Sequence, residues 1–292
     1  TYIKRGTSIN MKCKKQKMMR NLFIITLLWI VLPMKAIDYD IASIKKAVTV
    51  DTSMYKITYS LKFKYSQNDK DYQTDTRIVQ IGKHYVKDYS EILYHYDSLA
   101  TVNFSKGRST PSLPDPIFPY EILNNNIEKT CYIQYRTICR YTFCYHVPQM
   151  QQQWQLIPDT SMVILGHHCN MAKVNYAGRD YIAWYAIDIP IHYGPYKFAW
   201  LPGLIMKIED INKKYIWTVT GFSNKSAPIK NNTYEESKET TLEKANAAIR
   251  KMFYDSLTFS NSTGMTVMTI EHGKLVPVKS CKPIPFDPLV LE

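Results

Sequence analysis

Three sequence signatures of common enzyme and metal-protein classes are missing from this chain. It has only 10 glycines in 292 residues, and no glycine-rich segment is followed by the lysine of a phosphate-binding loop. No glycine-x-serine-x-glycine nucleophile elbow occurs. No second cluster of cysteine and histidine completes the four-ligand set of a structural zinc site. These absences argue against a P-loop nucleotide-binding protein, an α/β-hydrolase and a structural zinc protein.

Acidic residues are absent from the first 36 positions, and this distorts the charge of the whole chain. Residues 1–36 contain eight basic side chains, namely Lys4, Arg5, Lys12, Lys14, Lys15, Lys17, Arg20 and Lys35. Removing these eight from the formal net charge of +12 leaves +4 for residues 37–292. So small an excess gives no strong electrostatic reason to bind nucleic acid. We therefore expect no nucleic-acid partner.

A long apolar run is also missing. The segment "LFIITLLWIVLP" at residues 22–33 is shorter than the about 20 residues that a spanning helix needs. It follows the basic region Lys12–Arg20 and precedes Ala36, which is the order of an export signal and its cleavage site. We expect residues 1–36 to be upstream residues plus a cleaved signal peptide, with membrane contact only through that transient peptide. Residues 37–292 are then a single exported domain in the periplasm, at the outer-membrane surface or outside the cell.

Cysteine is scarce, and its number is odd once the leader is removed. Cys131, Cys139, Cys144, Cys169 and Cys281 remain, so at least one thiol cannot pair within the chain. The alternation in "YIQYRTICRYTFCYH" predicts one strand, on which Cys139 and Cys144 face opposite sides and do not bond to each other. Any disulfide should instead join separate elements, with Cys169 or Cys281 as one partner.

Tyrosine is abundant, with 23 residues, and the apolar pattern mostly repeats every second residue. Residues 55–65 alternate almost perfectly, and residues 74–82, 160–176 and 180–188 also resemble strands. Residues 203–210 and 214–222 predict a hairpin closed by "DINKK". Residues 84–100 predict a strand that leads into a short helix, and four prolines make residues 105–121 a loop.

One amphipathic helix is predicted late in the chain, over residues 240–257, with Thr240 and Glu243 at capping-box spacing. We therefore expect a mainly β fold. Its core is a large curved antiparallel sheet, a half-barrel or open barrel, with a packing α-helix near the C-terminus.

A dense run of spaced positions between residues 164 and 210 resembles the GLPGLI family of exported Bacteroidetes proteins. The matching positions are Ile164, Gly166, Cys169, Ala172, Gly178, Arg179, Ala183, Trp184, Ile189, Pro190, Gly194, Pro195, Phe198 and Leu201–Ile205. Weaker similarity covers "IGKHYVKDYS" near residue 81. Two positions depart from the family pattern: Trp200 replaces the first glycine of the hexapeptide, and His167 replaces a tyrosine. The resemblance implies export and a β fold, but the family has no assigned biochemical role.

The stretch "GPYKFAWLPGLI" predicts a rigid corner before a buried strand. We assign the structural motif to Gly194, Pro195, Leu201, Pro202, Gly203, Leu204 and Ile205. The two prolines fix φ, and Gly203 can adopt a positive φ. The hexapeptide from Trp200 to Ile205 offers no acid, base or nucleophile, so the corner is not expected to catalyse bond chemistry. A binding surface is the alternative role, with Trp200, Trp184, Tyr196 and Phe198 as its candidate residues.

The motif "GHHC" is the other candidate site. On a strand, His167 and Cys169 point the same way and could begin a copper or zinc site. Cys169, a histidine and Asp188 could also be combined as a nucleophile, a base and an orienting acid, although no spacing requires it. The tryptophans Trp154, Trp184, Trp200 and Trp217 fit either a core or a groove facing sugar or lipid. Core packing is favoured because they fall on alternating strands.

Two functional classes remain. The favoured one is a non-enzymatic binding or assembly factor that holds an apolar or peptide ligand, or an envelope protein, on its curved sheet. The alternative is a metal-assisted envelope enzyme or metal-binding protein that uses His167 and Cys169. The sequence identifies no cofactor and no particular ligand.

Overall fold

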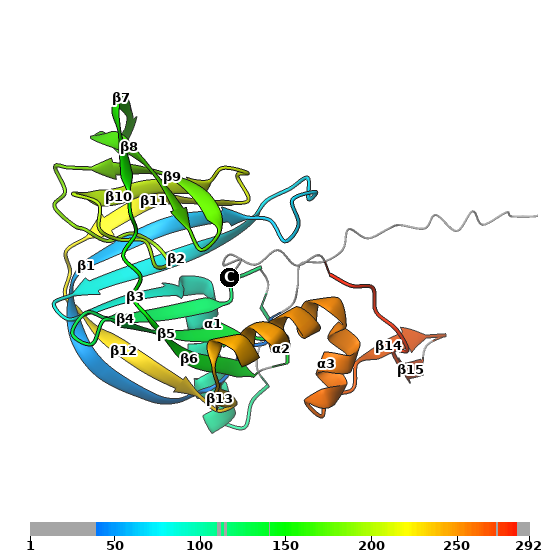
Figure 1. The fold of residues 1–292 in the computed structure, drawn as a ribbon. Coiled ribbons are helices and arrows are strands. Elements are labelled where there is room, and N and C mark those ends of the chain that lie inside the picture. The colour runs from blue at the N-terminus through cyan, green and yellow to red at the C-terminus, as the bar shows by residue number, and fades with distance from the viewer. Residues whose placement is uncertain (1–38, 110–111, 114–115, 140, 273, 285–292) are drawn as a thin grey trace, which may run out of the picture. The chain divides into compact units, whose positions relative to one another are not determined.

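One large, mostly antiparallel sheet dominates the computed structural model, which describes residues 39–109, 112–113, 116–139, 141–272 and 274–284 (Figure 1). Its strands follow the order β13-β6-β5-β4-β3-β2-β1-β11-β10-β9-β8-β7, and β12 also pairs with β1. Among the strands of the described residues, only β13 and β6 pair in parallel. The sheet curves without closing into a barrel. A mainly β fold with a curved antiparallel sheet and helices near the C-terminus is therefore confirmed.

The strand bounds show where the sequence pattern was informative. The strands are β1 (Ile44–Phe63), β2 (Gln73–Gly82), β3 (Tyr85–Ser90), β4 (Tyr120–Asn125), β5 (Thr130–Arg136), β6 (Thr142–Pro148), β7 (Gln155–Ile164), β8 (His167–Tyr176), β9 (Arg179–Ala186), β10 (Leu204–Asp210), β11 (Tyr215–Ser223), β12 (Ala227–Tyr234) and β13 (Ser237–Glu239). A separate hairpin contains β14 (Met268–Glu271) and β15 (Lys274–Pro277). The predicted hairpin of residues 203–210 and 214–222 is confirmed as β10 and β11, each of which begins one residue later.

Two predicted single strands are in fact hairpins. The segment 160–176 is divided between β7 and β8 by Leu165 and Gly166, which both have positive φ, as a two-residue hairpin turn requires. The segment 132–146 is divided between β5 and β6, where the Thr137 N–H donates to the Tyr141 carbonyl oxygen. Alternation continues on both sides of each turn, so periodicity alone did not reveal the reversal.

The turn between β5 and β6 also changes the cysteine argument. Cys139 lies in the turn and Cys144 in β6, so the reason given for their separation, one regular strand, is wrong. All five cysteines of the described residues have free thiols, and four of them are buried.

The helices are α1 (Glu91–Ser105), α2 (Leu242–Tyr254) and α3 (Ser256–Ser262). Residues 84–100 do form a strand followed by a helix, and the Ser90 side chain caps α1 by accepting from the Leu93 N–H. The late helix begins one residue later than the predicted capping box implies, because Thr241 and not Thr240 is its N-cap. It also ends at Tyr254, and α3 follows as a separate helix capped by Asp255.

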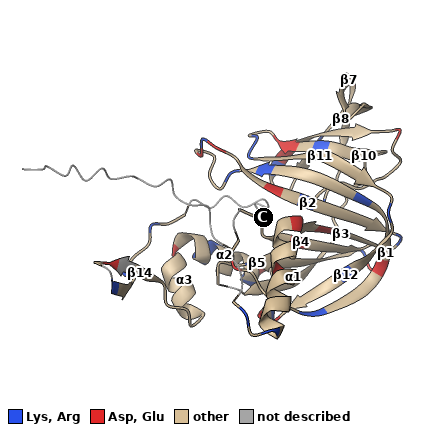
Figure 2. Cartoon of the chain, turned by 180° about the vertical axis from the view of Figure 1, so that it is seen from behind, with Lys and Arg blue, Asp and Glu red and all other residues tan. Residues whose placement is uncertain are grey.

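Strands β3 to β6 are covered on both faces, with α2 on one side and α1 on the other (Figures 1 and 2). Within β5, Ile133 and Tyr135 face the apolar core. Gln134 and Arg136 alternate with them and face a polar layer that includes β12 and α1. Both sets are almost completely buried. The same strands therefore separate an apolar compartment from a polar one.

Charged residues are dispersed over the strands and loops that Figure 2 displays, with no stripe of one sign in that view. None of the helices in the described residues is long and apolar enough to cross a membrane. The predicted signal peptide lies outside the described residues, and the prediction of one domain over residues 37–292 stays a prediction.

Candidate functional site

The predicted corner is the long connection between β9 and β10, residues 187–203, which we call the corner loop. Its central part forms a small hairpin, with a bridge between Tyr193 and Ala199 and a hydrogen bond from the Gly194 N–H to the Phe198 carbonyl oxygen at 2.8 Å. Gln152 fixes it from outside, because its side-chain oxygen accepts from the Ala199 N–H at 3.0 Å. The loop is thus held by hydrogen bonds along most of its length.

Two glycines are needed here because the chain packs too closely for a side chain. A Cβ on Gly203 would lie 2.1 Å from the Ala186 carbonyl oxygen, and one on Gly194 would lie 2.8 Å from Ile205 Cδ1. The expectation of a positive φ at Gly203 is wrong: the positive-φ residues of the loop are Tyr196 at 59° and Trp200 at 76°. Close approach to the neighbouring strand, and not a left-handed conformation, explains Gly203.

The tip of the corner loop is folded into the apolar face of the sheet. Tyr196 and Phe198 are 3% and 1% exposed. The Phe198 ring lies 4.7 Å from that of Tyr181 and 6.1 Å from that of Trp217, measured between centroids. These two candidate binding residues therefore pack in the core, although Tyr196 also reaches a cavity wall. The start of β10 is buried on both faces, as predicted, since Leu204, Ile205 and Met206 are all buried.

A buried carboxylate anchors this tip to the sheet. The Asp88 side chain on β3 accepts from the Tyr196 N–H and from Arg77 Nε at 2.9 Å. Arg77 also donates to the Phe118 carbonyl oxygen at 3.0 Å. Because a buried charge is tolerated only when it is paired and hydrogen-bonded, this network fixes the left-handed turn at Tyr196 in one place.

A cavity of about 220 Å³ lies between the corner loop, strands β5 and β6, the β8–β9 turn and α2. Most of its wall is apolar or aromatic, with Ile133, Tyr145, Val147 and Ile249 among the lining residues. Tyr120, Pro148, Met150, Tyr176, Ala177, Tyr196, Leu242 and Asn246 complete the wall, together with two cationic residues, Lys197 and Arg250. Such a cavity, with few polar groups in an apolar wall, is typical of a small-molecule site.

Lys197 is the half-buried cation of this wall. Its Nζ lies 5.1 Å from the ring centroid of Tyr196 and 5.8 Å from that of Tyr176. Burial lowers the pKa of Lys197, while the neighbouring Cys131 thiol opposes this shift. Burial also raises the pKa of Cys131 to about 11, so this thiol is neutral at pH 7 and supplies no counter-ion.

Sequence reasoning did not single out Lys197. It identified the neighbours Tyr196 and Phe198, because aromatic side chains are familiar binding groups. The available signal was that Lys197 is the one charged residue in "GPYKFAWLPGLI" and lies directly between the two candidate binding residues Tyr196 and Phe198.

The remaining candidate aromatic residues are not brought together. Trp200 is 41% exposed and lies near Lys129, whose Nζ is 6.0 Å from its ring centroid. It lines a second, much smaller cavity of about 20 Å³ that also contains Lys197 and Cys131. Trp184 is half-buried on β9 and lines neither of these cavities. The four proposed binding residues therefore form no single platform.

The second candidate motif places a histidine–carboxylate pair at the surface. His167 Nδ1 lies 2.6 Å from the Asp188 carboxylate. The buried Cys169 thiol donates to the His167 carbonyl oxygen at 3.5 Å, and burial raises its pKa. Over the described ranges, no group of three histidine, cysteine, aspartate or glutamate residues has the geometry of a metal site. The position of the thiol favours a packing role for Cys169.

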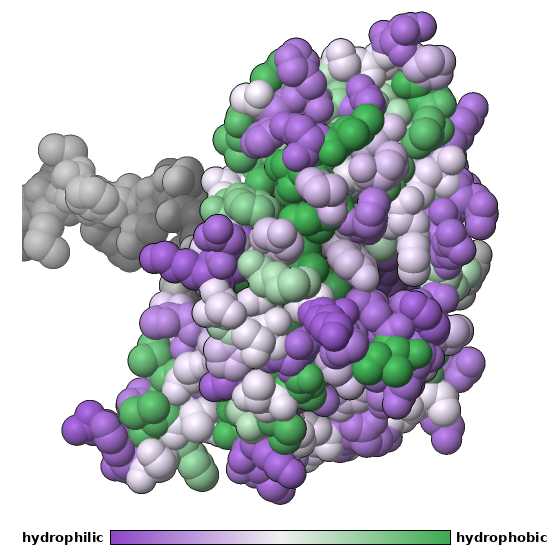
Figure 3. Space-filling view, turned by 90° about the vertical axis from the view of Figure 1, so that its left-hand side faces the viewer, coloured by the Kyte–Doolittle hydropathy of each residue, from purple (hydrophilic) through white to green (hydrophobic). Residues whose placement is uncertain are grey.

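Exposed apolar side chains occur on the strands and turns around this motif. Figure 3 shows hydrophobic residues gathered among hydrophilic ones in the upper half of that face, at the level of β7 to β11. The exposed apolar residues of these elements are Leu156, Val163, Leu165, Ile187, Trp200, Ile211 and Phe222. Nothing in the described part of the chain indicates what would cover them.

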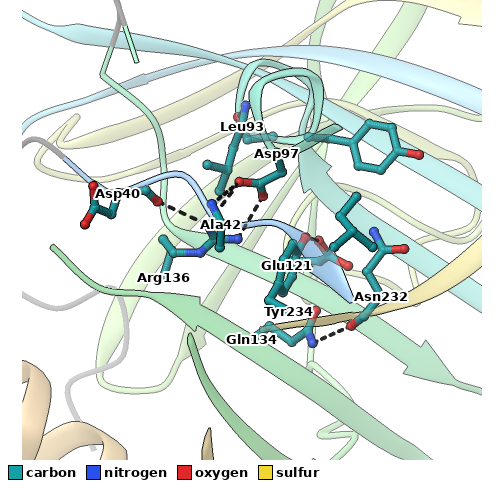
Figure 4. Close-up of polar contacts among 12 residues, drawn as sticks. Asp40, Ala42, Leu93, Asp97, Glu121, Gln134, Arg136, Asn232 and Tyr234 are labelled. Atoms are coloured by element: carbon teal, nitrogen blue, oxygen red, sulfur yellow. Dashed lines mark hydrogen bonds and ion pairs between the residues drawn. The ribbon is translucent and has the colours of Figure 1, made fainter. Parts of the chain in front are cut away.

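The polar layer on the opposite face of β3 to β6 contains buried ion pairs, of which Figure 4 shows Arg136 with Asp97. Arg136 donates to both carboxylate oxygens of Asp97, at 3.1 and 2.8 Å, and its guanidinium lies 4.4 Å from the ring centroid of Tyr234. Lys87 pairs with Glu121 at 2.6 Å. Each of these cations has an acidic partner, so the layer can be explained by packing of α1 and β12 on the sheet.

Part of the chain is similar to a protein family of unknown function. Residues 134–207, which run from β5 into β10 and include the corner loop, match a family described as "Protein of unknown function (Porph_ging)". No curated protein matches the chain.

Two solved structures of a protein named PNGF-II, in the P21 and C2 space groups, are similar at 15% and 14% identity with TM-scores of 0.46 and 0.45. The alignment covers 76% of this chain but only 35% of PNGF-II in each case. Likeness at this level supports no conclusion about function.

Proposed function

We propose that this chain is a non-enzymatic binding protein that holds an apolar small molecule, or the apolar side chains of a peptide, in the cavity between the corner loop and α2. The observation that carries the proposal is the cavity itself. It has a volume of about 220 Å³, several times the about 30 Å³ that one water molecule occupies in the liquid. An apolar occupant would remove much of its apolar and aromatic wall from water, which is favourable.

The surrounding construction supports a preformed site. The corner loop is fixed by Asp88, Gln152 and its own hairpin bonds, and α2 covers the cavity from the other side. A rigid wall reduces the ordering cost of binding. No acid–base pair with a nucleophile lines this cavity within the described residues, and this favours binding over catalysis.

We also propose membership in the GLPGLI family and export of the chain to the envelope, where its partner is an apolar ligand or another envelope protein. The left-handed backbone at Trp200 supports the family assignment, because the family pattern has glycine there and glycine adopts this conformation without strain. The basic and apolar order of residues 12–36 supports export. N-terminal sequencing of the protein from its own host should begin near Ile37. A chain that keeps residues 22–33 in a membrane fraction would contradict export.

A cavity-filling variant tests the binding function. Asn246 lines the cavity from α2, whereas the next residue, Ala247, is exposed and does not line it. Asn246→Phe should reduce binding of a neutral environment-sensitive dye such as Nile red at least tenfold, while Ala247→Phe should leave it unchanged. Native mass spectrometry of the protein from its host should show a retained small molecule in the wild type and in Ala247→Phe only. Equal dye binding by both variants would place the ligand elsewhere.

The metal-assisted alternative is the weaker proposal. It would use His167 and Cys169, but the imidazole is already paired with Asp188, and the thiol is buried and bonded to the backbone. Zinc or copper retained in native mass spectra, and lost on His167→Ala, would revive it.

A further inference from the structure

Lys197 is a cation without a counter-ion among the described residues. No carboxylate of those residues lies within 4.0 Å of its Nζ, although that distance captures the ion pairs of other lysines, such as Lys87 with Glu121. Its nearest aromatic neighbours, Tyr196 and Tyr176, present ring faces at 5.1 and 5.8 Å. A ring face attracts a cation by only about 0.5–2 kcal/mol. Two such rings orient the ammonium without neutralising it.

The place of Lys197 in the wall gives it access to a ligand. It lines both the larger cavity and the small cavity of about 20 Å³ beside it. The small cavity can hold about one water molecule, since about 10–15 Å³ is the minimum for this. An ammonium here can therefore keep one hydration partner and still face the larger cavity.

The rest of the larger cavity indicates that the body of the ligand is apolar. Ile133, Tyr145, Val147 and Ile249 form an apolar wall from β5, β6 and α2. An occupant gains free energy by burying apolar surface there. The second cation of the wall, Arg250, has an exposed side chain, so water already solvates its charge. Lys197 thus carries the one half-buried positive charge of this wall that still requires neutralisation.

We propose that the cavity binds an amphiphile with an apolar body and one carboxylate, and that the carboxylate pairs with Lys197. The inference rests on the proposed binding function and adds the chemical class of the ligand. A singly charged carboxylate matches one ammonium, whereas a phosphate monoester with nearly two negative charges would be only half neutralised. Pairing in a poorly hydrated wall strengthens the ion pair relative to one in water. A neutral ligand of the same length would leave the lysine charge unpaired.

Isothermal titration of the full chain with three ligands of equal chain length tests this inference. The probes are decanoate, decanol and decyl phosphate at pH 7. Decanoate should bind at least tenfold more tightly than decanol and also more tightly than decyl phosphate. In Lys197→Met the preference for decanoate over decanol should disappear, while decanol binding is kept. Lys197→Arg should retain part of the preference, and Lys173→Met, which removes an exposed lysine of β8, should retain all of it.

The outcomes separate the inference from the function on which it rests. Equal binding of decanoate and decanol by the wild type overturns the role of Lys197 and leaves the binding cavity intact. Tighter binding of decyl phosphate overturns the choice of carboxylate. If none of the three ligands binds, and Asn246→Phe has no effect on Nile red, the proposed function fails as well. Should Lys197→Met not fold, the wild-type preference and the Lys197→Arg variant decide the question.

Discussion

Arg136 and Lys197 are two cations on opposite faces of the same group of strands, and their surroundings differ completely. Arg136 makes two hydrogen bonds to Asp97 and a third to the Asp40 carbonyl oxygen at 3.1 Å. Among the described residues, the Lys197 ammonium has the faces of two tyrosine rings and no carboxylate partner. A fold that needs a buried charge for packing surrounds it with partners. The charge that lacks partners is the one that points to a ligand.

The comparison predicts that Arg136 is essential to stability as half of a pair. Asp97→Ala leaves the guanidinium buried without its acid and should lower the free energy of unfolding by about 3–5 kcal/mol. Urea unfolding monitored by tyrosine and tryptophan fluorescence measures this. Asp71→Ala, which removes an exposed carboxylate, is the matched control and should change stability by less than about 0.5 kcal/mol. The double variant Asp97→Leu, Arg136→Met should recover part of the loss. If Asp97→Ala unfolds like Asp71→Ala, the polar layer does not stabilise the fold.

The corner loop positions Lys197, so the next prediction concerns a substitution that disrupts the close packing of this loop. Gly203→Val places a Cβ only 2.1 Å from the Ala186 carbonyl oxygen and should cost about 1–3 kcal/mol by overpacking. Gly221→Val is the control, because the nearest atom to a Cβ there is Thr58 at 3.6 Å, an ordinary contact. Thermal melts of the two variants compare them. A Gly203→Val protein that melts with the parent would show that the loop yields easily.

Removal of the unpaired Lys197 charge should raise the free energy of unfolding, whereas disruption of the Arg136–Asp97 pair should lower it. Lys197→Met should raise the free energy of unfolding at pH 7 by about 0.5–2 kcal/mol, a typical gain for a stabilising substitution. The same variant should lose its preference for a carboxylate ligand. A gain in stability with a loss of binding is the mark of a functional charge. A destabilised Lys197→Met would mean that the lysine is a structural element after all.

The pH dependence sharpens this contrast. Burial lowers the pKa of Lys197 in the folded state, so the unfolded chain holds that proton to higher pH, near the ordinary value of about 10.4. The cost of the buried charge is therefore fully present below the lowered pKa and fades as the pH rises towards 10.4. The stability difference between Lys197→Met and wild type should shrink over that window, and decanoate binding should weaken over it. The titratable or charged groups that face or neighbour Lys197 are Cys131, Tyr176, Tyr196 and the rim residue Arg250. Cys131→Ala removes the thiol with a pKa of about 11 and is therefore the control titration.

The smallest expected effect concerns Trp200. Its φ of 76° strains a bulky residue, and Trp200→Gly should relieve this strain, with part of the gain offset by the greater freedom of glycine in the unfolded chain. The net gain should be about 0.5–1 kcal/mol in thermal melts. Trp200→Ala keeps the left-handed backbone without the indole and should melt close to the parent. Weaker binding of the apolar probes by both variants would assign Trp200 to the ligand, whereas unchanged binding would restrict the site to the larger cavity.

The sequence predicted a strand wherever apolar and polar residues alternate regularly along it. Residues 55–63 lie in β1, which also includes residues 44–54 that the pattern did not predict, and the β10–β11 hairpin was placed correctly. The pattern failed where two strands meet at a tight turn with matching parity, as at Leu165 and Gly166. It also missed β12, whose Pro228, Asn231 and Asn232 do not resemble a strand. Asn232 is nevertheless buried, because the polar layer and not the apolar core receives it.

The site was harder to predict than the fold. Aromatic residues near the corner were recognised, but whether a side chain lines a cavity or fills the core depends on packing between elements far apart in sequence. Ile249 on α2 and Lys197 in the corner loop reach one cavity from such different places. The absence of a counter-ion around Lys197 is a property of the folded chain, so no local sequence pattern could reveal it.

The long strand β1 also affects how the chain reaches its native state. One of its edges pairs with β2, which follows within a few residues, but the other edge waits for β11 and β12. Ser53 contacts Ala227, 174 positions later. Contacts of such high sequence separation slow folding, and an unpaired strand edge invites association with other chains. During synthesis one edge of β1 therefore stays unpaired until residues 215–234 have been made, and a holding chaperone or a low local concentration would limit association over that period.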